Sequence, residues 1–221
     1  MSLPLTGPSF APKSGNPPKQ VVILLHGLGA DGDDLIGLAP YFAQLLPDAE
    51  FLSPHAPFPC DMAPYGRQWF SLRDFGQEAM LQGLQAVRPT FDSYLDAVLE
   101  TRALTAADVA LVGFSQGTML SLHCALRRKS PVAALVGFSG MLVAPDRLIG
   151  EITARPPVLL IHGEQDPVVP FEAMGLAART LEALAVPTLA LARPGLDHSI
   201  DDEGLAASIR FVAGAFGEKQ V

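Results

Sequence analysis

The sequence is poor in several features, and each shortage argues against a class of protein. It has only two cysteines, Cys60 and Cys124, which cannot form a disulfide framework, so a reducing compartment, the cytoplasm, is expected. Charged residues make up 17% of the chain, the net charge is −8, and no basic run is longer than Arg127–Lys129, so nucleic acid is a poor partner. No apolar run approaches the ~20 residues of a membrane-spanning helix, so no membrane span is expected.

What the chain does have is apolar bulk, at 49% of its 221 residues, which is ample for one buried core. We therefore expect a single domain over residues 1–221. Residues 1–20 are rich in Pro, Gly and Ser and predict an extended lead-in with an edge strand near 7–12. This segment has neither the basic nor the apolar region of a secretory signal, which again favours the cytoplasm.

Short apolar runs alternate with segments of helical pattern along the rest of the chain. This alternation predicts an α/β fold with a mostly parallel sheet of about seven strands and helices on both faces. Asp33 is expected to cap the first helix and Pro89 to break or kink the second. The expected strands are 21–25, 49–52, 108–112, 132–138, 158–161 and 188–191. The expected helices are 34–46, 77–102, 118–126, 171–185 and 202–216.

The pentapeptide GFSQG at 113–117 lies between an expected buried strand and an expected helix. A serine flanked by glycines in this context is typical of a nucleophile elbow, in which a sharp turn exposes the serine above a helix N-terminus. The residues two before and two after the serine come close together there, so Gly113 and Gly117 suit those places. Ser115 is therefore the candidate nucleophile.

A serine hydroxyl needs a base, and the chain offers five histidines. His26 and His162 end strands beside glycines and are interpreted as packing or turn-stabilising residues, and His123 as a satisfied residue of the elbow helix. The role of His55, in the long loop 53–75, is left open. His198 follows the last expected strand, in a loop that faces the elbow in this architecture, and is the predicted base.

The carboxylate that orients the base should lie between serine and histidine in chain order. Asp166 meets this condition, directly follows an expected strand, and sits in a loop stiffened by Pro167 and Pro170. Asp197 adjoins His198, but neighbouring side chains on an extended loop diverge, and Asp146 is a further alternative acid. We predict Asp166.

An oxyanion needs two donors. One is the backbone N–H of Gln116, the residue after the nucleophile, and the other is expected from the glycine-containing turn after the first long strand, at Leu28. A phosphate-binding loop is the alternative reading of that turn, but it has neither the lysine of a P-loop nor the spacing of a dinucleotide fingerprint.

Five motifs stand out along the chain: HGLGADG at 26–32, WF at 69–70, GFSQG at 113–117, HGEQDPVVP at 162–170 and DH at 197–198. Together they resemble those of the phospholipase/carboxylesterase family, which includes bacterial carboxylesterases and acyl-protein thioesterases. The resemblance covers about residues 20–215 and implies a compact α/β-hydrolase fold. It also implies the triad Ser115, Asp166 and His198, with Leu28 and Gln116 as oxyanion donors. Ser71 stands where members often have Asp after the Trp-Phe pair.

The sequence therefore predicts a serine hydrolase of carboxylic esters with short to medium acyl chains, without metal or cofactor. A thioesterase or lysophospholipase is the alternative within enzymes, and a non-catalytic acyl-ligand binding protein the alternative outside them. The connection 139–156 is too short for a helical lid, so no large cap domain is expected. The sparse charge also favours a homodimer. The predicted walls of the acyl groove are Leu28, Met62, Trp69 and Val168.

Overall fold

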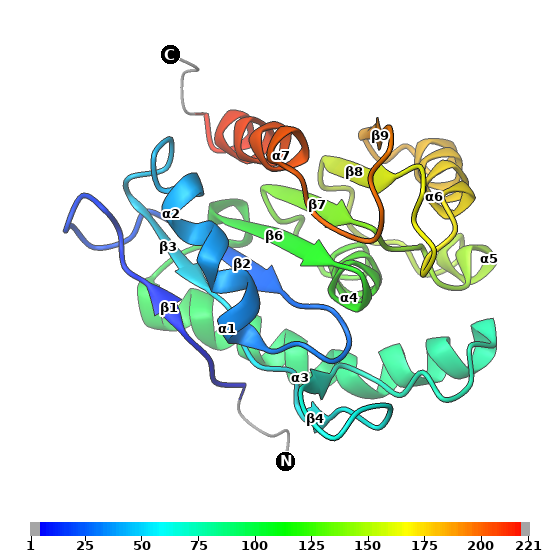
Figure 1. Cartoon of the computed structure of the whole chain (residues 1–221). Helices are drawn as coiled ribbons and strands as arrows, with labels where there is room; N and C mark the ends of the chain where they lie inside the picture. The colour runs from blue at the N-terminus through cyan, green and yellow to red at the C-terminus, as the bar shows by residue number, and fades with distance from the viewer. Residues whose placement is uncertain (1–4, 218–221) are drawn as a thin grey trace.

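The architecture was obtained as a computed structural model that describes residues 5–217. Its centre is a seven-stranded sheet in the order β1-β3-β2-β6-β7-β8-β9, in which every neighbouring pair is parallel except the β1–β3 pair at one edge (Figure 1). The predicted α/β class and mostly parallel sheet are therefore confirmed. The strands are β1 (Ser9–Phe10), β2 (Gln20–Leu25), β3 (Ala49–Leu52), β6 (Val109–Phe114), β7 (Ala134–Phe138), β8 (Val158–Gly163) and β9 (Thr188–Arg193).

Alternate residues of the central strands face two separate apolar cores. In β2, Ile23 joins the core shared with the helices on one face, and Val22 and Leu24 join the core on the other, all fully buried. A continuous apolar run is what a parallel strand covered on both faces requires. The helices on the first face are α3 (Gln77–Arg102), α4 (Gln116–Ala125) and α6 (Glu172–Ala183). Those on the second are α1 (Gly32–Leu35), α2 (Ala39–Phe42) and α7 (Asp202–Ala215).

The first helical region differs from the expected single helix over 34–46. It consists of α1, a 3-10 turn at Ile36–Leu38 and α2, and the cap of α1 is Asp31, whose side chain accepts from the Asp33 N–H at 2.9 Å. The prediction of Asp33 as cap was wrong. A proline in the first turn of a helix costs no hydrogen bond, so Pro40 lets α2 begin anew.

Helix α3 is unbroken over 26 residues, with Pro89 inside it. The expected break is therefore absent. Val87 and Phe91 on either side of Pro89 are buried in the core, and this packing holds the helix together where the proline removes a backbone hydrogen bond. Among the described helices none is both long and apolar enough to cross a bilayer.

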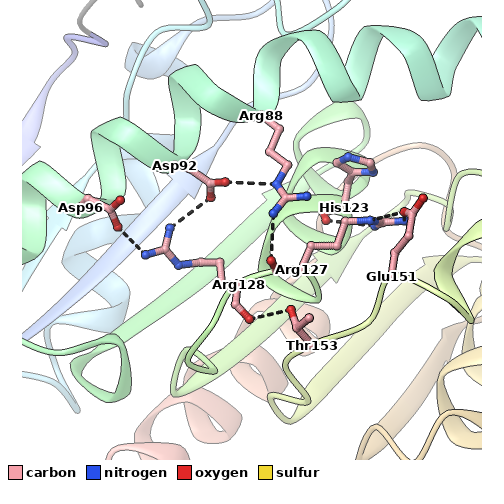
Figure 2. A network of polar contacts seen from close by, with 8 residues as sticks. All are labelled: Arg88, Asp92, Asp96, His123, Arg127, Arg128, Glu151 and Thr153. Atoms are coloured by element: carbon pink, nitrogen blue, oxygen red, sulfur yellow. Dashed lines mark hydrogen bonds and ion pairs between the residues drawn. The ribbon is translucent and has the colours of Figure 1, made fainter.

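A polar network joins α3 to the end of α4 (Figure 2). Arg88 donates to Asp92 at 3.1 Å and to the Arg127 carbonyl at 2.8 Å. Arg128 bridges Asp92 and Asp96, at 3.0 and 2.5 Å. These contacts tie together two helices on the same face of the sheet, so the network supports the fold beneath the elbow helix.

Two shorter features complete the chain. The loop 53–75 contains a small hairpin of β4 (Phe58–Pro59) and β5 (Arg67–Gln68). The connection after β7 holds only the four-residue helix α5 (Pro145–Leu148). This connection is too small to cover the sheet edge, in agreement with the expected absence of a large cap.

Candidate active site

Ser115 stands at the sharp turn between β6 and α4, with φ 53° and ψ −113°. A positive φ in a residue other than glycine is strained, and such strain is held only where the surroundings enforce it. A side chain on Gly113 would come within 2.6 Å of the Gly117 backbone, and one on Gly117 within 1.9 Å of the Leu25 carbonyl. Gly113 therefore permits the turn for the steric reason expected from the sequence, whereas Gly117 is required by a close approach of the end of β2 that the sequence did not indicate.

Asp166 lies just beyond β8, and its side chain is fully buried. Its Oδ1 accepts from the amides of Val168 and Val169 at 2.8 and 2.9 Å, and its Oδ2 lies 2.7 Å from Nδ1 of His198. Burial by itself would raise the pKa of this carboxyl, but the hydrogen bonds from His198, Val169 and Val168 outweigh it and bring the pKa below its ordinary value. Asp166 is thus held as a buried carboxylate facing an imidazole.

His198 lies in the loop between β9 and α7. The end of β8 packs closely against this loop. The Gln165 N–H donates to the Leu196 carbonyl at 3.0 Å, and a side chain on Gly163 would come within 2.3 Å of the same carbonyl. The imidazole rests on the ring of Phe114, the residue before Ser115, with ring centroids 4.9 Å apart. The structure therefore brings His198 and Asp166 together beside the elbow.

The alternative acids lie elsewhere. Asp197 is exposed, and its Oδ1 accepts from the Ser199 hydroxyl at 2.5 Å. Asp146 is exposed in the first turn of α5. The carboxylate bonded to His198 is the one that follows β8, as the chain order predicts.

Gln116 begins α4 and is fully buried. Its backbone N–H lies in the first turn, where amides have no acceptor within the helix and carry the positive end of the helix dipole. Its side chain accepts from the Trp69 amide at 2.8 Å and donates to the Phe70 carbonyl at 2.7 Å. The side chain thus ties the loop 53–75 to the elbow, a role that the sequence did not indicate because it depends on how that loop folds back.

The turn after β2 is held by the hairpin. Gly29 donates to the Arg67 carbonyl at 2.9 Å, and the Arg67 amide donates to the Ala30 carbonyl at 2.8 Å. Within residues 5–217 no acceptor is found for the Leu28 N–H. This amide is therefore available to a bound group, as the second oxyanion donor requires.

Trp69 corrects the prediction of a groove wall. It is fully buried, its indole N–H donates to the His26 carbonyl at 2.9 Å, and its ring lies 5.4 Å from the His26 ring. A buried side chain offers no surface to a substrate, so Trp69 is a support beneath the turn that carries Leu28. His26 is also buried, and burial lowers its pKa. Its Nε2 accepts from the Ala56 amide at 3.0 Å, so this imidazole serves the packing role expected from the sequence.

The other predicted wall residues differ in exposure. Met62 is 53% exposed and Val168 64% exposed, whereas Leu28 is half-buried. Ser71 donates to Asp61 Oδ2 at 2.5 Å, and this hydrogen bond lowers the pKa of Asp61. A carboxylate therefore does lie beside Ser71, although it comes from position 61.

One group of side chains has the spacing of a cation site among the described residues. Ligand atoms of Asp31, Asp33 and His55 lie within 4.8 Å of one another. Nδ1 of His55 already accepts from the Gly32 N–H at 3.1 Å, and Asp31 already caps α1. These bonds give the residues a local structural role in the turn after β2.

Comparison with known proteins gives consistent results. The sequence profile of the Phospholipase/Carboxylesterase family matches residues 9–215. Esterase YpfH of Escherichia coli K12 is 27% identical over 190 residues, which cover 86% of this chain and 80% of that protein. Acyl-protein thioesterase 1 of Gibberella zeae is 26% identical over 201 residues, which cover 83% of this chain and 85% of that protein.

Solved structures show the same likeness. The crystal structure of esterase PE8 aligns with a TM-score of 0.92 and 38% identity, over 96% of this chain and all of that one. SOBER1 of Arabidopsis thaliana aligns with a TM-score of 0.76 and 25% identity, over 89% of this chain and 98% of that one. The family profile spans the sheet, the elbow and the loops of Asp166 and His198, and on that match the chain belongs to the phospholipase/carboxylesterase family.

Proposed function

We propose that this protein is a serine hydrolase that cleaves carboxylic esters of short to medium acyl chains. Ser115 is the nucleophile, His198 the base and Asp166 the carboxylate that orients it. The backbone N–H groups of Leu28 and Gln116 bind the oxyanion. The observation that carries the proposal is the 2.7 Å contact of the buried Asp166 side chain with His198, whose ring rests on the residue before Ser115.

The chemistry follows from these positions. Ser115 Oγ attacks the acyl carbon while His198 Nε2 takes its proton, and Asp166 stabilises the resulting imidazolium. The oxyanion forms at the N-terminus of α4, where each preorganised donor is worth roughly 10²–10³-fold in rate. His198 then gives the proton to the leaving alcohol, which departs and leaves Ser115 acylated. Water attacks the acyl-enzyme with His198 again as base, and the acid leaves.

A thioester is the second candidate substrate, because the same steps release a thiol. Relatives named acyl-protein thioesterase 1 match over most of the chain. A lysophospholipid would meet the same machinery. The open question is therefore which acyl group and leaving group the loops around the elbow accept.

The test combines labelling with a substrate panel. A fluorophosphonate probe should label the parent protein at Ser115, and Ser115→Ala should abolish the labelling. The parent should also hydrolyse p-nitrophenyl esters, with acyl-CoAs and lysophospholipids assayed in parallel. A protein that neither reacts with the probe nor cleaves any of these substrates would be an acyl-ligand binder, and the proposal would be wrong.

We further propose that the chain works as one α/β-hydrolase domain, in the cytoplasm, as a homodimer. Support for the dimer comes from the sparse charge of the chain and from Leu189, which is 60% exposed on β9, a strand at the edge of the sheet. Light scattering at micromolar concentration should give twice the mass of one chain. A mass of one chain would reject the dimer.

A further inference from the structure

His162 is a buried histidine that the steps above do not use. It lies in β8, at the strand end that leads into the Asp166 loop, and is only 2% exposed. Its Nε2 lies 3.2 Å from Asp166 Oδ2 and 2.9 Å from the Val169 carbonyl. The sequence suggested packing or turn stabilisation, which the Val169 contact supplies, but not the contact with Asp166.

The neighbours of this nitrogen determine where its hydrogen lies. A carbonyl oxygen can only accept, and so can an ionised carboxylate. Nε2 of His162 must therefore carry a hydrogen, which it donates to the Val169 carbonyl at 2.9 Å. The Asp166 oxygen that accepts from His198 lies 3.2 Å from the same nitrogen, so this N–H group also stands beside the carboxylate.

We infer that His162 is a positioning residue for the proposed triad, acting through Asp166. The inference rests on the proposed function. The amides of Val168 and Val169 hold Oδ1, and His162 and His198 approach Oδ2. With both oxygens held, the carboxylate cannot rotate about its Cβ–Cγ bond without losing donors. Oδ2 therefore stays aimed at His198 while that imidazole takes up and returns a proton.

Loss of this donor should affect turnover more than binding. His162 contacts the Val169 carbonyl through Nε2, its ring centroid lies 6.1 Å from that of Phe171, and it is not among the residues predicted to line the acyl groove. A carboxylate free to turn would hold His198 less well, and misplacement by about 1 Å can cost on the order of 10²-fold in rate. If His162 only packed the loop, its substitution would lower stability, and the loss of kcat would not depend on whether the new side chain carries a hydrogen-bond donor at the position of Nε2.

The experiment compares His162→Gln, His162→Asn and His162→Leu by kcat and KM on a p-nitrophenyl ester. The glutamine amide nitrogen is as many bonds from the backbone as the imidazole Nε2, whereas that of asparagine is closer. We expect the Asn and Leu variants to lose roughly 10–10²-fold in kcat with little change in KM. The Gln variant should stay within about threefold of the parent.

Phe171→Leu is the matched control, because it loosens the packing around His162 but keeps the donor. It should lower the melting temperature with kcat near that of the parent. Should His162→Leu fail to fold, the difference in kcat between His162→Gln and His162→Asn still tests the inference. Equal losses of kcat in His162→Gln and His162→Asn would overturn the inference. A folded His162→Leu variant with parental kcat would overturn it as well. A parent without esterase activity or Ser115 labelling would instead overturn the proposed function.

Discussion

Two polar regions of this molecule both contain carboxylates but differ in what holds them. On α3, Asp92 and Asp96 are paired with Arg88 and Arg128 (Figure 2). Beside the elbow, Asp166 has no lysine or arginine partner within residues 5–217, and only amides and imidazoles face it. A guanidinium stays charged at any ordinary pH, whereas an imidazole gains and loses its proton near neutrality.

The histidines of the two regions also differ in their hydrogen-bond partners. His123, in the α3–α4 region, is buried with no hydrogen-bond partner among the described residues for either ring nitrogen, so the prediction of a satisfied helix residue was wrong. Burial first, and then the charges of Arg127 and Arg88, lower its pKa from 6.5 to about 3. It stays neutral at working pH and has no carboxylate to assist it. The comparison teaches that burying a histidine does not make it a base, because a base also needs an acceptor for its second nitrogen.

The largest expected effect tests the carboxylates directly. Asp166→Asn should lower kcat by roughly 10⁴-fold, because the amide no longer holds the required imidazole tautomer or stabilises its charge. Asp92→Asn and Asp197→Asn should leave kcat near the parental value. The measurement is kcat for ester hydrolysis by each folded variant. A larger loss in Asp197→Asn than in Asp166→Asn would show that the wrong acid has been assigned.

Stability, unlike kcat, should depend on the network between α3 and α4. Arg128→Ala removes hydrogen bonds to two carboxylates from a side chain that is 14% exposed, and should lower the free energy of unfolding by about 1–3 kcal/mol. The kcat should not change, since Arg128 lies away from the elbow loops. Urea titration of the variant beside Lys129→Ala, an exposed neighbour, measures the difference. Equal midpoints for the two would mean that the network contributes nothing measurable.

A smaller effect concerns acyl length at the elbow. Each methylene buried between Leu28, Met62 and Val168 should add up to about 0.8 kcal/mol, roughly fourfold in kcat/KM. Activity on p-nitrophenyl esters below their micelle thresholds should therefore rise from acetyl to medium chains and then level off. Met62→Ala should flatten the rise, whereas Trp69→Ala should act through stability. A maximum at acetate, or a steady rise through palmitate, would contradict the groove.

The last effect is a change in how steeply stability depends on pH. Because the folded-state pKa of His123 lies below 6.5, the unfolded chain binds its proton first. Stability from this residue is therefore lost as pH falls from 6.5 toward about 3. His123→Leu should make the free energy of unfolding less dependent on pH between these limits and leave kcat unchanged. His26, whose pKa is also lowered, should keep part of the slope in the variant.

The sequence was most informative where one residue's chemistry depends on its neighbours along the chain. The apolar runs indicated the strands, because a parallel strand buried on both faces needs a continuous apolar run. The glycines around Ser115 predicted the elbow, because the sharp turn leaves little room for side chains beside it. Helix continuity was harder to predict. Pro89 sits inside an unbroken helix because core packing compensates for it, and the expected helix over 34–46 is divided by the 3-10 turn Ile36–Leu38 that precedes Pro40.

The candidate site shows the same limit. Chain order was enough to choose Asp166 and His198, which the structure brings to 2.7 Å. Burial of Trp69 could not be predicted, since it depends on how a 23-residue stretch, 53–75, folds back onto the turn at His26. The contact of His162 with Asp166 was not predicted, although the histidine lies only four positions before the aspartate. The contact depends on the shape of the loop, which turns the two side chains toward each other.

Gly66 has a consequence for engineering. It has φ +75°, and a side chain there would come within 1.9 Å of the Gly29 carbonyl, so the hairpin and the turn of Leu28 touch backbone to backbone. A designer who exchanges this hairpin for one from a relative, to change substrate preference, must transplant the glycine with it. Met62, between β4 and β5, is the position in this hairpin expected to change acyl preference, whereas any larger residue at position 66 would move the turn and its amide together.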